Sequence, residues 1–321
     1  MRRVMADAEV GDDVYGEDPS VNRLQKTAAE LTGKQAALYV SSGSMGNLIS
    51  IFIHSGSGGE VLTHKNSHII HHELSSASAL AGSALIGLDG PRGKLTAETL
   101  SQALRPGGYD SCRSSLIEIE NTISGVYYRE EELKEVYDFA RRQNLPVHID
   151  GARLFNAALA SGMTAASIAK YCDSVTFCLS KGLGAPVGSV LCGSREFIEK
   201  AKRFRKMLGG GLRQSGIIAA AGVWALENNI DRLKDDHRAA VMIAEALEKS
   251  GWAELDREDA ETNIIYFRTP AHNPADVVTA LEKRGVLCFQ GGPDSIRMVT
   301  SLALEDGDAE AVCRIISGLE I

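Results

Sequence analysis

The chain has 321 residues, of which 44% are hydrophobic and 24% are charged. It carries 34 Lys and Arg against 42 Asp and Glu, so its formal net charge is −8. An acidic chain of this kind argues against a nucleic-acid partner or an anionic membrane surface, and its apolar content argues against disorder.

Short β-branched runs alternate with amphipathic segments in the first two thirds of the chain. The predicted strands are 36–40, 60–64, 83–88, 114–120, 146–150, 174–179 and 188–192. Helices are predicted at 44–54, 96–104, 129–143, 164–170 and 194–207. This alternation predicts an α/β fold with a mainly parallel sheet and helices on both of its faces.

The pattern changes towards the C-terminus. Two longer helices are predicted at 214–227 and 230–250, and the first is rich in small residues that allow close packing. A β, α, β, β, α order follows at 262–268, 274–284, 286–290, 295–300 and 306–319, which predicts a small α/β domain. We therefore expect an N-terminal arm at 1–26, a large domain at 27–235 and a small domain at 236–321.

The cysteines and the N-terminus indicate the compartment. The six cysteines are far apart and form no CxxC pair, so we expect buried free thiols rather than a disulfide framework or a zinc site. The first 13 residues lack the apolar stretch of a signal peptide, and no uninterrupted apolar run is long enough to span a membrane. We expect a cytoplasmic protein without a metal site.

Three polar features lie at predicted strand ends, where open α/β sheets bind ligands. The turn at 41–47 is rich in Ser and Gly and opens a helix, which allows backbone N–H groups to hold a phosphate. Asp150 closes one strand, and Lys181 follows the next strand along the chain. Taken singly, each has a common structural explanation: a helix start, a helix cap and a solvated charge.

The order of the three features is more informative than any one of them. A phosphate cradle, an acid and a lysine, each at a strand end, meet the needs of pyridoxal 5′-phosphate (PLP). The lysine forms a Schiff base, the acid keeps the pyridine nitrogen protonated, and the turn holds the phosphate. A ring must also cover one face of the cofactor, and His68 follows a fourth strand, although a capping or surface histidine would look the same.

Six segments closely resemble the low-specificity L-threonine aldolases, which are fold-type-I PLP enzymes with a transferase-like fold. The most specific are HIDGAR (148–153), LSKGL (179–183) and GGGLRQ (209–214), which occur in the order of that family. The others lie at 11–25, 39–47 and 66–69, and the likeness extends to IRMVTS at 296–301.

The resemblance implies a role for individual residues. Lys181 would form the Schiff base, Asp150 would pair with the pyridine nitrogen, and His68 would stack on the ring. The phosphate would be held by Gly43 and Ser44, and the substrate carboxylate by Arg153 and Arg297, since a guanidinium binds carboxylates in a bidentate manner.

The resemblance also implies an oligomer with shared active sites, either a homodimer or a homotetramer. Arg213 would reach the cofactor phosphate of a neighbouring subunit, and Tyr15 would approach the partner's site. Arg213 follows a basic run at 200–206, which on composition alone is a solvated helix face.

Two departures from the family concern the substrate. Members usually begin earlier, with a stretch whose serine contacts the substrate carboxylate, whereas this chain starts at Met1. The family also has a histidine facing the substrate hydroxyl where this chain has Ile123. His71 and His72 are candidate replacements, although exposed histidines at a helix end explain them equally well.

The resemblance implies retro-aldol cleavage of L-threonine or L-allo-threonine to glycine and acetaldehyde, with His68 as the available base. Two alternatives stay open. The same scaffold supports β-elimination or racemisation of an amino acid, and a PLP-binding protein that has lost catalysis would preserve the fold.

Overall fold

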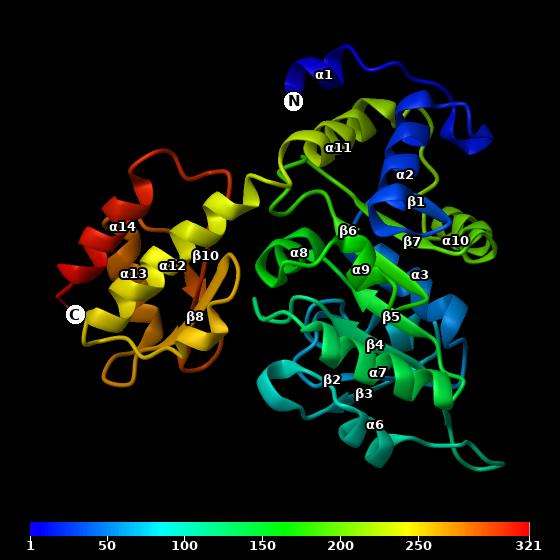
Figure 1. Cartoon of the computed structure of the whole chain (residues 1–321), viewed down its shortest axis with the longest axis horizontal. Helices are drawn as coiled ribbons and strands as arrows, with labels where there is room; N and C mark the ends of the chain where they lie inside the picture. The colour runs from blue at the N-terminus through cyan, green and yellow to red at the C-terminus, as the bar shows by residue number, and fades with distance from the viewer. Residues whose placement is uncertain (321) are drawn as a thin grey trace. The chain divides into compact units, whose positions relative to one another are not determined.

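The computed structural model describes residues 1–320 and divides into two compact units (Figure 1). The first comprises Met1–Ile123 and Tyr128–Ile230, and the second comprises Ser124–Tyr127 and the chain from Asp231 onward. The arm and the two domains expected from the sequence stay a prediction. Among residues 1–320, no helix is both long and apolar enough to cross a lipid bilayer.

Within residues 1–320, the first unit is built on a seven-stranded sheet of order β1-β7-β6-β5-β4-β2-β3. The strands are β1 (Ala36–Val40), β2 (Gly59–His64), β3 (Ala84–Leu88), β4 (Arg113–Glu120), β5 (Val147–Asp150), β6 (Ser174–Cys178) and β7 (Ser189–Gly193). The pairs from β3 to β6 are parallel, whereas β7 runs antiparallel to both β6 and β1. The observed fold is thus the predicted α/β class with a mainly parallel sheet.

The antiparallel β7 follows from its connection to β6, which is too short to hold a crossover helix. Gly188 begins this return with a φ of 101°, and a Cβ there would collide with the ring of Tyr39. Only glycine satisfies both conditions at this position.

Two groups of helices pack on the sheet (Figure 1). Helices α3 (Gly43–His54) and α10 (Arg195–Met207) contact each other and strands β1 and β7. Helix α2 (Pro19–Thr32) contacts the same two strands together with α9 (Ala165–Ala169) and α11 (Gly216–Asn228). The remaining helices of the unit are α1 (Arg2–Ala6), α4 (His68–His71), α5 (Ser76–Ala79), α6 (Ala97–Ala103), α7 (Glu130–Arg142) and α8 (Leu154–Ser161).

Helices α2 and α8 come in addition to those predicted, as do the short helices α1, α4 and α5. The first five residues of α8 are all buried, so the helix lacks the polar face that produces a helical period in the sequence. Helix α2 is capped by Asp18, whose carboxylate accepts the Val21 N–H at 3.0 Å. Its start is therefore encoded by one capping residue rather than by a long apolar pattern.

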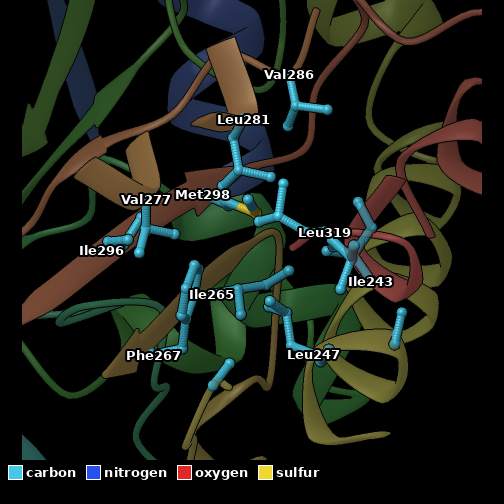
Figure 2. Packing of buried hydrophobic residues seen from close by; sticks show 14 of the residues in the cluster. Ile243, Leu247, Ile265, Phe267, Val277, Leu281, Val286, Ile296, Met298 and Leu319 are labelled. Carbon is cyan, nitrogen blue, oxygen red and sulfur yellow. The ribbon is translucent and has the colours of Figure 1, made fainter. Parts of the chain in front are cut away.

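The second unit has its own apolar core. Its helices are α12 (Leu233–Lys249), α13 (Pro274–Glu282) and α14 (Asp308–Ser317). Among its described residues, β8 (Ile264–Arg268), β10 (Ser295–Val299) and β9 (Phe289–Gln290) form an antiparallel sheet in that order. Figure 2 shows side chains from the strands and the helices, such as Ile265, Leu281 and Ile243, gathered in one cluster.

Strand β9 is shorter than the predicted 286–290, because only its last two residues pair with β10. Val286 turns into the core, whereas the neighbouring Leu287 is 81% exposed.

The cysteines only partly follow the expectation of buried thiols. Cys172, Cys178 and Cys192 are buried, Cys288 and Cys313 are half-buried, and Cys112 is exposed, so the expectation is wrong for Cys112. All six are unpaired in the described part of the chain. Cys112 lies in the loop that precedes β4, outside the buried part of that strand.

Candidate active site

Asp150 closes β5 at the carboxyl edge of the sheet, beside Glu120 of β4 in the strand register. Its carboxylate is 3% exposed. Oδ1 accepts the backbone N–H of Ala152 at 3.0 Å, and Oδ2 accepts Asn47 Nδ2 at 2.7 Å. A buried carboxylate with both oxygens held by donors has a fixed orientation, as an acid facing a ligand nitrogen requires.

The turn after β1 leads directly into α3. Ser42 caps the helix, and its Oγ accepts the Met45 N–H at 3.2 Å. Gly43 and Ser44 form the first turn, whose N–H groups suit an anion. A Cβ on Gly43 would lie 3.0 Å from Cys178 Sγ, so this turn packs closely on the end of β6.

His68 begins α4 just after β2. Its backbone N–H donates to Glu120 Oε2 at 2.9 Å, and its Nδ1 lies 2.9 Å from Glu73 Oε1. The hydrogen bond to Glu73 raises the pKa of the His68 imidazole against the opposing effect of burial. Because Nδ1 is engaged with a carboxylate, Nε2 is the ring atom available for proton exchange.

Acidic side chains accumulate around Asp150. Burial, joined by the charge of Asp150, raises the pKa of Glu120 to about 7. The same two causes raise the pKa of Glu118 well above its usual range. Glu73 is also buried, and its Oε2 has no hydrogen-bond partner. These carboxyl groups make the binding of a positively charged group at this site favourable.

Lys181 stands three residues beyond the end of β6 and is exposed. Its charge opposes the shifts of both the His68 pKa and the Glu120 pKa, so its ammonium lies near the acidic group. The structure therefore brings Lys181, Asp150, His68 and the α3 turn to one edge of the sheet.

These residues fit PLP. Asp150 offers a buried acceptor for a protonated ring nitrogen, which would supply positive charge where carboxyl groups crowd together. The α3 turn offers N–H groups for the phosphate dianion, and Lys181 offers a solvent-accessible amine. Side-chain atoms of His68, Glu73 and Asp150 also lie within 4.8 Å of one another, as metal ligands would. However, His68 Nδ1 is already hydrogen-bonded to Glu73, and Asn47 Nδ2 donates to both carboxylates.

The comparison with known proteins decides the family. The model of the family described as "Beta-eliminating lyase" matches residues 1–270. The chain belongs to this family. It is 43% identical to the low specificity L-threonine aldolase of Escherichia coli K12 over 303 residues, covering 94% of this chain and 90% of that one. It is 42% identical to the low-specificity L-threonine aldolase 1 of Arabidopsis thaliana, covering 93% and 86%.

A solved structure shares the fold of this lyase-family chain. The threonine aldolase of Leishmania major has a TM-score of 0.83 at 21% identity, covering 94% of this chain and 90% of that one. The resemblance to low-specificity L-threonine aldolases, drawn above from short motifs, is thereby confirmed over nearly the whole chain.

The two arginines expected at the substrate carboxylate lie in different units. Arg153 immediately precedes α8, three residues after Asp150, and its charge lowers the pKa of Cys178 against the larger effect of burial. Arg297 lies on β10 of the second unit, and its guanidinium is 5.9 Å from the ring centre of Tyr266 and 5.1 Å from that of Phe289. The role of each stays a prediction.

Arg213 forms an ion pair with the N-terminal segment of the chain. Its Nη1 is 2.7 Å from Asp12 Oδ2, and its side chain is 57% exposed. Tyr15, from the same segment, is 70% exposed. The two residues expected to serve a neighbouring subunit are thus both accessible in a single chain.

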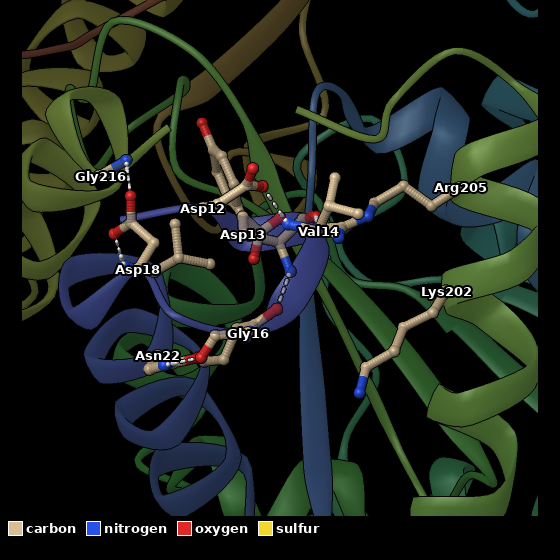
Figure 3. Close-up of polar contacts among 12 residues, drawn as sticks. Asp12, Asp13, Val14, Gly16, Asp18, Asn22, Lys202, Arg205 and Gly216 are labelled. Carbon is tan, nitrogen blue, oxygen red and sulfur yellow. Dashed lines mark hydrogen bonds and ion pairs between the residues drawn. The ribbon is translucent and has the colours of Figure 1, made fainter. Parts of the chain in front are cut away.

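The basic run before Arg213 is not wholly a solvated face, because Arg205 is buried. Its Nη2 is 2.9 Å from Asp13 Oδ2, and its Nη1 donates to the Tyr39 carbonyl at 2.8 Å. Figure 3 shows the Arg205 side chain pointing toward Asp13, whereas the Lys202 side chain does not contact Asp13. Arg205 ties α10 to the N-terminal segment.

Ile123, at the position where the resemblance implies a histidine, is 2% exposed and packs against the turn at Gly93. His71 and His72 are both exposed, and His71 Nε2 lies 2.8 Å from the Lys65 carbonyl. The His72 ring is 5.3 Å from the His68 ring. Of the two replacements considered, His72 is therefore the one beside His68.

Several site residues were not singled out in the sequence: Asn47, Glu73, Glu118, Glu120 and His148. Asn47 lies one helical turn after Gly43, and His148 lies two residues before Asp150 on the same strand face. That spacing was the available signal, but only the sheet register shows that these side chains meet.

Proposed function

We propose that this chain is a PLP-dependent aldehyde-lyase that cleaves L-threonine and L-allo-threonine to glycine and acetaldehyde. The observation that carries the proposal is the buried, doubly hydrogen-bonded Asp150 beside His68 and Lys181 at one sheet edge, in a chain of the beta-eliminating lyase family. The threonine aldolase relatives support this substrate class.

Seven residues would contact the cofactor, including Arg153 and, from a neighbouring subunit, Arg213. Lys181 would bind it covalently, Asp150 would accept the pyridine N–H, and His68 would cover the ring. The N–H groups at Gly43 and Ser44 would bind the phosphate, in agreement with their place at the start of α3. The bound cofactor supplies an electron sink for the pair released when Cα–Cβ breaks.

His68 is the proposed base for the substrate hydroxyl. With Nδ1–H held by Glu73, neutral His68 presents Nε2 as a proton acceptor. The β-hydroxyl proton passes to Nε2, the Cα–Cβ bond breaks, and the hydroxyl oxygen becomes the aldehyde carbonyl. Cα of the glycine then takes a proton, which closes the balance. The hydrogen bond to Glu73 raises the His68 pKa above the usual value for histidine. The cleavage rate should therefore increase as the pH rises through this raised pKa, because only neutral His68 accepts the proton.

Arg153 and Arg297 are the proposed partners of the substrate carboxylate. A guanidinium binds a carboxylate through two parallel N–H···O bonds, which fixes the amino acid in one orientation. For Arg297 the assignment rests on the family motif IRMVTS alone.

We also propose a cytoplasmic homodimer or homotetramer with shared sites. The accessible Arg213 and Tyr15 support a role toward a neighbouring subunit, and the six unpaired thiols suit a reducing compartment. The net charge of −8 supports a small-molecule substrate rather than nucleic acid.

Labelling of Lys181 tests the cofactor assignment. Borohydride reduction of the purified holoenzyme should fix PLP on Lys181, and Lys181→Ala should lose both the label and threonine cleavage. Lys170→Ala, which removes an exposed lysine paired with Glu130, is the matched control and should keep both. A label on another lysine overturns the assignment.

The products test the reaction. Acetaldehyde and glycine should form in equal amounts from L-threonine. Release of 2-oxobutyrate with ammonia would instead show β-elimination, and loss of optical activity without cleavage would show racemisation.

Mixing of variants tests the shared site. Arg213→Ala and Lys181→Ala chains, each inactive alone, should regain activity when mixed, because hybrids can contain one site with both residues. A mixture of Arg142→Ala with Lys181→Ala controls for exchange, since Arg142 is exposed on α7. Inactive hybrids after verified exchange would contradict the shared site.

A further inference from the structure

A continuous series of hydrogen bonds leads away from Asp150 between α3 and strands β5 and β6. Asn47 Nδ2 is 2.7 Å from Asp150 Oδ2, and Asn47 Oδ1 is 3.2 Å from His148 Nε2. His148 Nδ1 is 2.9 Å from Ser174 Oγ, which is 2.9 Å from His54 Nε2. Asn47, His148 and Ser174 are each at most 1% exposed. Together with His54 they form one hydrogen-bonded series that ends at Asp150.

The direction of the first link is fixed by chemistry. Asn47 Nδ2 faces two carboxylates, Asp150 at 2.7 Å and Glu73 Oε1 at 3.0 Å. An amide nitrogen has two hydrogens to donate, whereas the amide oxygen in that place would face two acceptors. Oδ1 of Asn47 is therefore the end that faces His148, and it can only accept.

The tautomers of both histidines follow from this. His148 Nε2 must carry the proton that Asn47 accepts, and burial lowers the His148 pKa to about 3, so the ring has one proton. Nδ1 then accepts from the Ser174 hydroxyl, and Ser174 Oγ in turn accepts from His54 Nε2–H. Burial lowers the His54 pKa to about 4, so His54 is also neutral.

Every hydrogen in the series therefore points toward Asp150. Aligned hydrogen bonds polarise one another, so each donor strengthens the next and the last one reinforces the negative charge on Asp150 Oδ2. The amide of Asn47 interrupts proton transfer, so the series orients and polarises rather than conducts protons. Placing these polar groups in a core costs stability that an apolar layer would not.

We propose that Asn47, His148, Ser174 and His54 are positioning residues that hold Asp150 as an oriented carboxylate acceptor for the ring nitrogen of PLP. The inference rests on the proposed function. It adds to that function a set of residues outside the cofactor's reach that set how strongly Asp150 binds the cofactor. Glu118 and Glu120 lie close to this acid, since the charge of Asp150 contributes to the raised pKa of both.

The first experiment measures the tautomers in the cofactor-free full chain. With ¹⁵N-labelled histidine, the signals that disappear in His148→Gln and His54→Gln should be neutral Nε2–H rings between about pH 6 and 8. A Nδ1–H ring at position 148, or a charged one, overturns the direction of the series. This result does not depend on any activity.

The second experiment measures PLP affinity by titration of the cofactor-free protein. His148→Leu removes the donor to Asn47 and should weaken binding about tenfold or more, as loss of a hydrogen bond in a charged network does. His148→Gln preserves a donor at the place of Nε2 and should restore affinity to within about threefold of the parent.

Serine variants provide the matched pair. Ser174 and Ser50 are both 0% exposed, but Ser50 Oγ donates to the Gly46 carbonyl, outside the series. Ser174→Ala should weaken PLP binding about threefold, with a lower kcat and an unchanged KM, whereas Ser50→Ala should leave affinity at the parent value.

The outcomes separate the two proposals. Equal losses in Ser174→Ala and Ser50→Ala, or losses that follow the melting temperature, would show a structural role and overturn the inference. A parent protein that binds no PLP would instead overturn the proposed function, while the tautomer result would still report the direction of the series.

Discussion

The two units of this chain fill their interiors in different ways. The second unit has an aliphatic and aromatic core of strands and helices, with Phe267, Leu281 and Ile296 at its centre (Figure 2). Between α3 and the sheet, the first unit instead buries carboxyl groups, an amide and an imidazole, as Glu118, Asn47 and His148 show. One interior is made for stability, and the other carries charge.

The difference shows which part of the molecule bears the stability cost of the proposed function. An apolar core gains free energy with each buried carbon, whereas a buried carboxyl group loses hydration and must be compensated by donors or by a proton. The polar side chains between α3 and the sheet lead to Asp150, so these costly buried groups lie next to the proposed cofactor site. Changes in the two interiors should accordingly affect different measured quantities.

Asp150→Asn should produce the largest effect of this kind. The amide keeps the shape but cannot stabilise a protonated ring nitrogen, so kcat should fall about 10²–10³-fold, as for loss of one preorganised electrostatic partner. The free energy of unfolding should change little, because the loss of one accepted hydrogen bond is offset by the removal of a charge near Glu118 and Glu120. Steady-state kinetics and urea unfolding measure the two. A variant that loses both equally would contradict the comparison.

Leu281→Ala should do the reverse in the second unit. Leu281 is 0% exposed, and deletion of such a side chain costs about 2–5 kcal/mol of unfolding free energy. Leu287→Ala, in the same unit but 81% exposed, should change it by less than about 0.5 kcal/mol. Urea unfolding followed by circular dichroism measures both. Similar losses at the two positions would refute the apolar core as the source of stability.

Glu118→Gln should raise stability only at higher pH. Burial raises the folded-state pKa of Glu118, so the unfolded state releases this proton first and the folded state loses stability as pH rises above the unfolded value. Glutamine cannot ionise, and the variant should match the parent near pH 5 and melt a few degrees higher near pH 8. Scanning calorimetry at both pH values measures it. An equal shift at both would show that the carboxyl proton is irrelevant.

The smallest expected effect concerns the two diastereomers of the substrate. A polar partner for the β-hydroxyl would discriminate between them by about 1–3 kcal/mol, and the buried Ile123 cannot supply one. The kcat/KM values for L-threonine and L-allo-threonine should therefore lie within about tenfold of each other. Direct assay of both decides the matter. A preference of several hundredfold would point to His72, and His72→Phe would then abolish it.

Much of the fold and part of the candidate site could be predicted from the residue pattern. Strands 36–40, 60–64 and 114–120 were predicted within one residue of their ends, because strands buried in the sheet are apolar runs bounded by turn residues. Asp150 and Lys181 were found because a strand end followed by a polar residue is a local signal. Helix α8 gave no such signal, since its buried face extends around the helix.

The sequence by itself thus determined the α/β class, the strand ends of the first unit and the motifs that identify the family. Only the tertiary structure decided that Asn47, His148 and Ser174 meet, since Asn47 lies 101 positions from His148 in the chain. Such contacts depend on which strands are neighbours and on their register, and a shift of one residue would turn each side chain to the opposite face. The charge around Asp150 is for that reason a property of the fold, assembled from residues that look ordinary one at a time.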